Sequence, residues 1–133
     1  MLEPNTELYP AIRLYARCSD ARQQASESGE PSIDAQLHAL QKRAAEIPHG
    51  AIHEYIDEGR SAWKQPWEER RGLQTLLQEA NAGDLVMAWD AKRLSRRNFG
   101  LSSLFRCFWQ RKLDVMLLIG MGQMSKFEFS QGG

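Results

Sequence analysis

The sequence predicts an α/β domain in which a mostly parallel central sheet carries helices on both faces. Short apolar runs alternate along the chain with segments of helical periodicity, and this alternation is typical of such folds. Two of the runs, 85–89 and 115–119, are continuously apolar, as strands buried on both faces of a sheet are. The chain has 133 residues, of which 42% are hydrophobic, which suffices for one domain with a real core.

Four strands are expected. Residues 11–18 alternate with period two, residues 51–56 form a weaker second strand, and the two apolar runs supply the others. In a parallel sheet, binding and catalytic side chains gather beyond the carboxyl ends of the strands. Functional residues are therefore expected in the segments that follow the strands: 17–19, 57–59, 90–97 and Gly120.

Three helices are expected between the strands. Ser32 is a suitable N-cap for the first, whose inner face is formed by Ile33, Leu37, Leu40 and Ala44. The second runs from about Trp67 to Ala80 and closes at 81–83. The third has a wide apolar face with spacing i, i+3, i+4, i+7, i+8, made by Leu101, Leu104, Phe105, Phe108 and Trp109.

The charge is unevenly distributed although the formal net charge is zero. Residues 1–90 hold nine Lys/Arg and fifteen Asp/Glu, whereas residues 91–133 hold eight Lys/Arg and two Asp/Glu. This asymmetry favours a phosphate-bearing partner that meets the basic part of the chain. A solvated helix face produces some of the same pattern and is the commoner cause of a charge run.

Several classes of protein are excluded or disfavoured. The chain has no P-loop and no third glycine after Gly120-Met121-Gly122, so no nucleotide cofactor is expected. His49 and His53 lack further ligands, and no metal is expected. Two cysteines, Cys18 and Cys107, cannot make a disulfide framework, which favours the cytoplasm. No apolar run reaches membrane-spanning length, and residues 1–10 lack the apolar core of a signal peptide.

The chemistry that remains is a serine among arginines. Ser19 follows Arg17 by two residues at a strand end, and Arg93 and Arg96 are three apart after the third strand. Guanidinium groups suit a phosphodiester under attack because they stay charged and offer forked donors. From spacing alone, a second interpretation is favoured, in which these are ordinary loop residues and the arginines pair with carboxylates.

Five short motifs in order change this balance. The sequence resembles the catalytic domain of the serine recombinases, the resolvase/invertase family, from about Ile12 to Ile119. Each motif is weak alone, but five in the right order at compatible spacing are specific; they are Tyr15–Ser19, Ser32–Leu37, Tyr55–Gly59, Arg70–Leu73 and Arg93–Arg96.

The resemblance implies an enzyme that cuts DNA without metal or ATP. A serine attacks the scissile phosphate to leave a 5′-phosphoserine link and a free 3′-hydroxyl, and the strands rejoin after exchange in a synaptic tetramer. By motif, Ser19 is the nucleophile and Arg17, Arg93 and Arg96 bind the phosphate. Arg70 resembles a further active-site arginine and Asp57 its acidic partner. The resemblance also gives Gln23 and Gln36 as polar supports and Tyr15 as a scaffold residue, although a packed strand tyrosine explains Tyr15 equally well. The basic side chains of Lys92 and Arg97 are expected to contact DNA phosphates.

Two departures from the family pattern bear on function. The family usually has Asp where this chain has Lys92, although Asp90 lies nearby. Residues 1–10 are expected to be a tail, 11–120 the catalytic domain, and 121–133 a second tail in which Met121–Met124 resembles the start of a truncated dimerisation helix. No helix-turn-helix fits after it, so a catalytic domain without its DNA-binding domain is expected.

Three interpretations follow. The first is a competent recombinase module whose partner is DNA and whose full-length form associates as a dimer and a synaptic tetramer. The second is a non-catalytic truncated remnant or regulator that pairs with full-length recombinase subunits. The third, an unrelated flavodoxin-like signalling domain, has no need of this set of arginines. The intact serine and arginines favour the first interpretation, and Lys92 with the missing helix favours the second.

Overall fold

The computed structural model describes residues 8–18, 31–58, 66–94, 98–119 and 123–124. The strands are β1 (Tyr9–Cys18), β2 (His49–Glu58), β3 (Leu85–Ala88), β4 (Asp114–Leu117) and β5 (Gln123–Met124). The helices are α1 (Ile33–Ala44), α2 (Arg71–Glu79), α3 (Ala91–Leu94) and α4 (Asn98–Gln110), with a 3₁₀ turn η3 (Trp67–Glu69) before α2.

The strands form one sheet in the order β2-β1-β3-β4-β5. The first four are parallel, and β5 pairs antiparallel with β4, so the predicted mostly parallel sheet is confirmed. The connection that follows β1 leads to β2 on one side, whereas the connection that follows β3 leads to β4 on the other side. The carboxyl ends of β1 and β3 thus form the switch point of the sheet, which is where α/β proteins build their sites.

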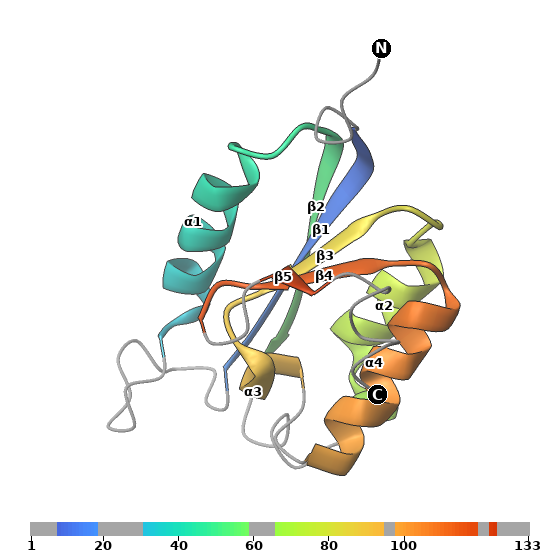
Figure 1. The fold of residues 1–133 in the computed structure, drawn as a ribbon. Coiled ribbons are helices and arrows are strands. Elements are labelled where there is room, and N and C mark those ends of the chain that lie inside the picture. Colours follow the sequence, from blue (N-terminus) through green and yellow to red (C-terminus); the bar gives the residue numbers. More distant parts are fainter. Residues whose placement is uncertain (1–7, 19–30, 59–65, 95–97, 120–122, 125–133) are drawn as a thin grey trace.

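Helices cover both faces of the sheet, as predicted (Figure 1). On one face, α1 packs Leu40 and Ala44 against Ile12, Leu14 and Met87. On the other face, α2 and α4 bury the larger cluster, which includes Tyr15, Leu73, Leu76, Leu104 and Phe108. Burial of each such side chain contributes roughly 1.5–3 kcal/mol, which makes these two layers the main source of stability.

Local signals explain where α1 and α4 begin and end. The Ser32 side chain accepts a hydrogen bond from the Ala35 amide, which confirms the predicted N-cap of α1. At the end of α4, Lys112 has a positive φ of 63°. The Lys112 amide donates to the Trp109 carbonyl, and the Leu113 amide donates to the Phe108 carbonyl. This is the Schellman arrangement, with lysine where glycine is preferred.

Three segments differ from the sequence prediction. The helix expected from Trp67 is a 3₁₀ turn there, and α2 starts only after Arg70, whose backbone is extended. Residues 91–94 form a short helix of their own. The helix start expected at Met121–Met124 is wrong at Gln123–Met124, which pair as a strand with the edge of β4. An open strand edge offers unpaired backbone groups, and this pairing satisfies them.

A buried polar cluster lies near the start of β1, on the face that α2 covers. Arg13 donates to Asp84 at 2.9 Å and to the Tyr55 hydroxyl at 2.6 Å, and that hydroxyl donates to Glu79 at 2.7 Å. Burial lowers the pKa of Arg13, but its bonds to Asp84 and Tyr55 outweigh that effect and leave it raised. The cluster therefore ties β1, β2, α2 and the start of β3 together as a structural unit.

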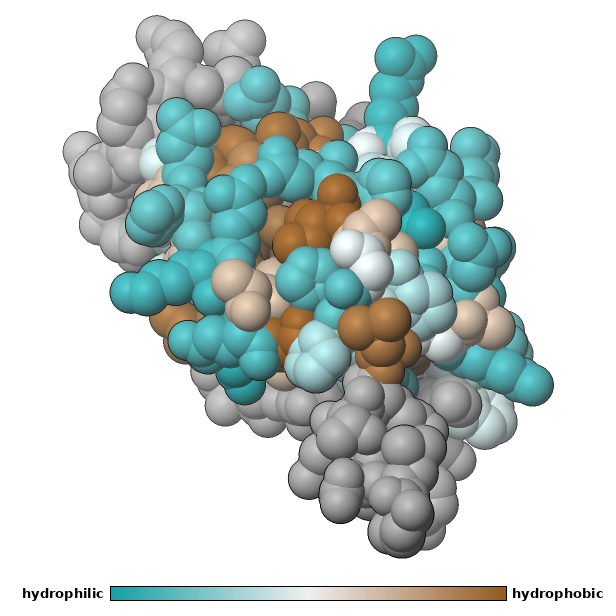
Figure 2. Space-filling model, turned by 90° about the horizontal axis from the view of Figure 1, so that it is seen from above, coloured by the Kyte–Doolittle hydropathy of each residue, from teal (hydrophilic) through white to brown (hydrophobic). Residues whose placement is uncertain are grey.

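The face of the molecule seen from above is mainly hydrophilic. Figure 2, which views the molecule from above, shows charged and polar side chains over most of that face, with apolar ones visible between them. No helix in the part of the chain that the structure describes has both the length and the apolar character needed to cross a membrane.

Candidate active site

The end of β1 presents Arg17 to the α2 side of the sheet, two residues beyond Tyr15 on the same face. Its backbone is held from α1 by Gln36, which is fully buried. The Arg17 amide donates to Gln36 Oε1 at 3.1 Å, and Gln36 Nε2 donates to the Arg17 carbonyl at 2.8 Å and to the Pro31 carbonyl at 3.0 Å. Gln36 thus fixes the backbone at the carboxyl end of β1, just before the segment that contains Ser19.

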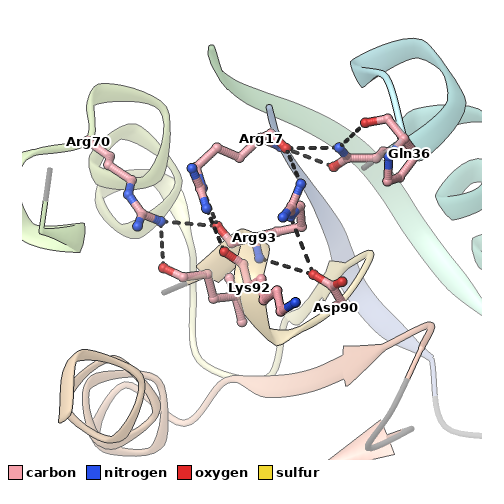
Figure 3. Close-up of polar contacts among 8 residues, drawn as sticks. Arg17, Gln36, Arg70, Asp90, Lys92 and Arg93 are labelled. Carbon is pink, nitrogen blue, oxygen red and sulfur yellow. Dashed lines mark hydrogen bonds and ion pairs between the residues drawn. The ribbon is translucent and has the colours of Figure 1, made fainter. Parts of the chain in front are cut away.

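The carbonyl oxygens of α3 orient two arginines (Figure 3). Arg17 donates from Nε to the Arg93 carbonyl at 3.0 Å and from Nη2 to the Lys92 carbonyl at 2.6 Å. Arg70, at the N-cap of α2, donates from Nη1 to the carbonyls of Arg93 and Leu94 at 3.1 and 2.5 Å. Arg17 is 0% and Arg70 2% exposed. Two guanidinium groups from distant segments therefore meet at one short helix.

Arg93 completes the cluster through both its backbone and its side chain. Its carbonyl accepts from Arg17 and Arg70, and its own Nη1 donates to the Arg17 carbonyl at 3.1 Å. The Oδ1 atom of Asp90 lies 3.3 Å from Arg93 Nε and accepts from the Arg93 amide at 3.2 Å. Among the described residues, the three buried arginines carry more positive charge than the Asp90 carboxylate offsets, so the cluster suits an anion.

Asp57 and Tyr15 hold the start of α2, the helix that follows Arg70. Asp57 follows Ile56 near the end of β2 and accepts from the amides of Gly72 and Leu73 at 2.8 and 3.0 Å, so it caps the first turn of α2. The Tyr15 hydroxyl donates to Asp57 Oδ2 at 2.7 Å. Burial, followed by the nearby negative charge of Asp57, raises the pKa of Tyr15 far above its ordinary value. The phenol therefore stays a neutral donor, and the role visible for Asp57 is to anchor α2.

Seven of the predicted site residues fall within the described ranges. Four of them share one hydrogen-bonded network, which is formed by Arg17, Gln36, Arg70 and Arg93. Two more, Tyr15 and Asp57, form a pair that is bonded to the first turn of α2, next to Arg70. The seventh, Lys92, joins through its backbone carbonyl while its side chain is exposed. The remaining predicted residues lie outside the described ranges; they are Ser19, Gln23, Arg96 and Arg97.

Sequence reasoning missed the backbone groups of the site. The carbonyls of α3 and the amides at the start of α2 carry no residue-type signal, because every residue has them. One sequence signal was present, which is the glycine at position 72 within a predicted helix. In the structure, a Cβ there would lie 2.6 Å from the Ile56 carbonyl oxygen, so α2 and β2 approach too closely for a side chain. Glycine in the Arg70–Leu73 motif thus reflects close packing.

Comparison with known families agrees with this geometry. A family model described as the resolvase N-terminal domain matches residues 12–128. The chain belongs to this family. It is therefore a serine recombinase catalytic domain, and the family acts in site-specific DNA recombination. No curated protein matches the chain.

Solved structures show the same fold. The N-terminal catalytic domain of TP901-1 integrase is 25% identical with a TM-score of 0.62, and the match covers 81% of this chain and 76% of that one. The C-terminal catalytic domain of ISC1926 TnpA, an IS607-like serine recombinase, is 19% identical with a TM-score of 0.63 over 84% and 72% of the two chains. A resolvase family site-specific recombinase from Streptococcus pneumoniae is 17% identical with a TM-score of 0.56 over 82% and 72%.

Proposed function

We propose that this chain is a catalytic module that cleaves and rejoins DNA strands through a 5′-phosphoserine intermediate at Ser19. The observation that carries the proposal is the convergence of Arg17, Arg70 and Arg93 from three separate segments at the carboxyl ends of β1 and β3. Ser19 follows this cluster by two residues along the chain. A positively charged, water-poor site next to a hydroxyl is what phosphoryl transfer requires.

In the proposed reaction, the Ser19 hydroxyl oxygen attacks the scissile phosphorus. A bond forms between phosphorus and the serine oxygen, the bond to the 3′-oxygen breaks, the serine proton leaves, and the 3′-oxygen takes up a proton. The exchanged 3′-hydroxyl then attacks the phosphoserine and releases Ser19. Since one phosphodiester bond is conserved at each step, no external energy source is needed. The arginines stabilise the charge that develops on the non-bridging oxygens.

Arg70 is well prepared for such an oxyanion. Both of its hydrogen bonds to described residues use Nη1, so the buried edge formed by Nε and Nη2 is not used by them. Its Nε atom is buried without a hydrogen-bond partner in the described part of the chain. A buried donor without a partner is costly, and two phosphate oxygens on that edge would satisfy it in a forked geometry.

The other predicted residues have supporting roles in this proposal. Arg96 joins the phosphate-binding set and either Arg93 or Arg96 assists the leaving 3′-oxygen, while Lys92 and Arg97 contact neighbouring DNA phosphates. Gln36 and Gln23 hold the segment around the nucleophile, and Asp57 with Tyr15 holds α2. The full-length form pairs as a dimer and assembles a synaptic tetramer on DNA.

The test is a fusion of the whole chain to the dimerisation and DNA-binding parts of an active recombinase, incubated with that recombinase's site. A covalent protein–DNA product is expected with the natural sequence and is lost with Ser19→Ala. Arg70→Ala should slow its formation by about 10²–10³-fold, because one buried donor set to the transition state is removed. Ser102→Ala, on the exposed side of α4, is the matched serine control and should leave the product unchanged.

The same experiment separates the catalytic proposal from its alternative. A folded fusion that binds the site without forming the covalent product contradicts the catalytic proposal. If that fusion also inhibits an active recombinase when the two are mixed, the result supports a non-catalytic regulator that pairs with recombinase subunits.

A further inference from the structure

The ion pair between Asp90 and Arg93 lies at the border of the arginine cluster (Figure 3). Asp90 lies two residues after the end of β3 and directly before α3. Its Oδ1 atom contacts both the Arg93 amide, at 3.2 Å, and Arg93 Nε, at 3.3 Å. The side chain of Arg93 is 7% exposed and that of Asp90 is 26% exposed. One carboxylate oxygen therefore orients the backbone and the guanidinium of the same residue.

Arg93 passes this orientation on to the other arginines. Its carbonyl is the acceptor shared by Arg17 Nε and Arg70 Nη1. Its Nη1 donates to the carbonyl of Arg17, so the two residues hold each other reciprocally. A four-residue helix is too short to be stable by itself, so the position of these carbonyls depends on tertiary contacts, and those to Asp90 are among them.

Position 92, where the family usually has Asp, is a lysine in this chain and supplies no carboxylate to the cluster. Its side chain is exposed, and among the described residues it joins the cluster through its backbone carbonyl. The positive charge of Lys92 adds to the repulsion among the arginines. The negative charge of Asp90, directly before α3, offsets this repulsion.

We propose that Asp90 is a positioning residue of the active site, which holds the Arg93 guanidinium and the α3 carbonyls in the arrangement that aims Arg17 and Arg70 at the scissile phosphate. This inference rests on the proposed function. Asp90 touches no reacting atom; it acts through Arg93. Its negative charge, and not simply its ability to cap α3, is the property that matters.

Two variants separate charge from capping. Asparagine and serine accept hydrogen bonds from helix amides about as well as aspartate does, so Asp90→Asn and Asp90→Ser keep the cap of α3. Neither can form an ion pair with Arg93 Nε. Asp34→Asn, on the exposed first turn of α1, is the matched control because it removes an equal charge far from the cluster.

The first measurement follows arginine Nε–H signals by NMR in the whole chain. The Arg93 signal is assigned by its loss in Arg93→Lys, and the Arg13 signal, whose partner is Asp84 at 2.9 Å, serves as an internal reference. Asp90→Asn should speed exchange of the Arg93 Nε proton with water by about tenfold, because Arg93 loses the carboxylate whose ion pair holds its guanidinium in place. The Arg13 signal and the Asp34→Asn spectrum should not change. An unaltered Arg93 signal in Asp90→Asn would overturn the inference.

The second measurement is covalent product formation by the fusion described above. Asp90→Asn and Asp90→Ser should lower the single-turnover rate by about 10–100-fold while DNA affinity stays within about twofold, because the arginines are misaligned and not lost. Rates equal to the unmodified fusion would overturn the inference and leave the proposed function intact. A fusion that forms no product with the unmodified chain would overturn both.

Discussion

The phenol of Tyr15 and the carboxylate of Asp57 are joined by a hydrogen bond of 2.7 Å, and the same carboxylate accepts from the first amides of α2. Asp57 therefore links Tyr15 on β1 to the start of α2, the helix whose N-cap is Arg70. The position of Arg70 thus depends on a residue with which it shares no hydrogen bond in the described structure.

Asp57→Ala should lower the free energy of unfolding by about 2–4 kcal/mol, because it removes a helix cap and leaves the buried Tyr15 hydroxyl without its acceptor. Urea denaturation followed by circular dichroism measures this loss. Glu58→Ala, at the exposed end of β2, is the control and should change stability by less than about 0.5 kcal/mol. Equal effects of the two substitutions would contradict the anchoring role of Asp57.

Tyr15→Phe should cost about 2 kcal/mol at neutral pH through the lost hydrogen bond to a charged acceptor. It should also change the response to alkali. Burial and then Asp57 raise the pKa of Tyr15 above its ordinary 10.0, so the folded state holds the proton more tightly than the unfolded state does. The stability from this group is present below pH 10 and is lost as the pH rises further.

Denaturation curves between about pH 8 and pH 11 test this linkage. The natural sequence should lose stability above pH 10 more steeply than Tyr15→Phe does. A smaller slope should remain in the variant, because burial and the bond to Glu79 also raise the pKa of Tyr55. Parallel curves for the two proteins would show that Tyr15 does not carry the effect.

Gly72→Ala should destabilise the domain although alanine is the better helix former. The added Cβ would lie 2.6 Å from the Ile56 carbonyl oxygen and 2.9 Å from Asp57 Oδ2, and backbone atoms cannot move aside cheaply. A loss of about 1–3 kcal/mol in the free energy of unfolding is expected. Gln78→Ala on the exposed side of α2 should stay within about 0.5 kcal/mol. A neutral or stabilising Gly72→Ala would mean that α2 does not approach β2 this closely.

Lys112→Gly should raise the free energy of unfolding by about 0.5–1 kcal/mol, since glycine adopts the left-handed conformation at no steric cost. Lys112 has a φ of 63° in the turn that ends α4. The control is Gln110→Gly in the last turn of α4, which should lower stability by about 1 kcal/mol. Thermal denaturation resolves the two opposite signs, and a destabilising Lys112→Gly would contradict the left-handed turn.

Local patterns were sufficient to predict much of the fold. The Ser32 cap, the apolar face of α1 and the continuous apolar run at 85–89 depend on residues a few positions apart, and each corresponds to an element of the structure. The start of α2 was not predictable in this way. Its first amides are capped by Asp57, which lies 15 and 16 residues earlier in the chain.

By itself, the amino-acid sequence determined the order of the main strands and helices, the two apolar faces and, through five motifs, the candidate site residues Arg17, Arg70 and Arg93 that the fold brings together. The tertiary structure alone decided which groups orient them: the α3 carbonyls that hold Arg17 and Arg70, the carboxylate of Asp90 on Arg93, and the strand pairing of β5. The bond from Arg17 to the Arg93 carbonyl spans 76 residues. Backbone carbonyls are common to all residues, so only folding selects which of them a guanidinium meets.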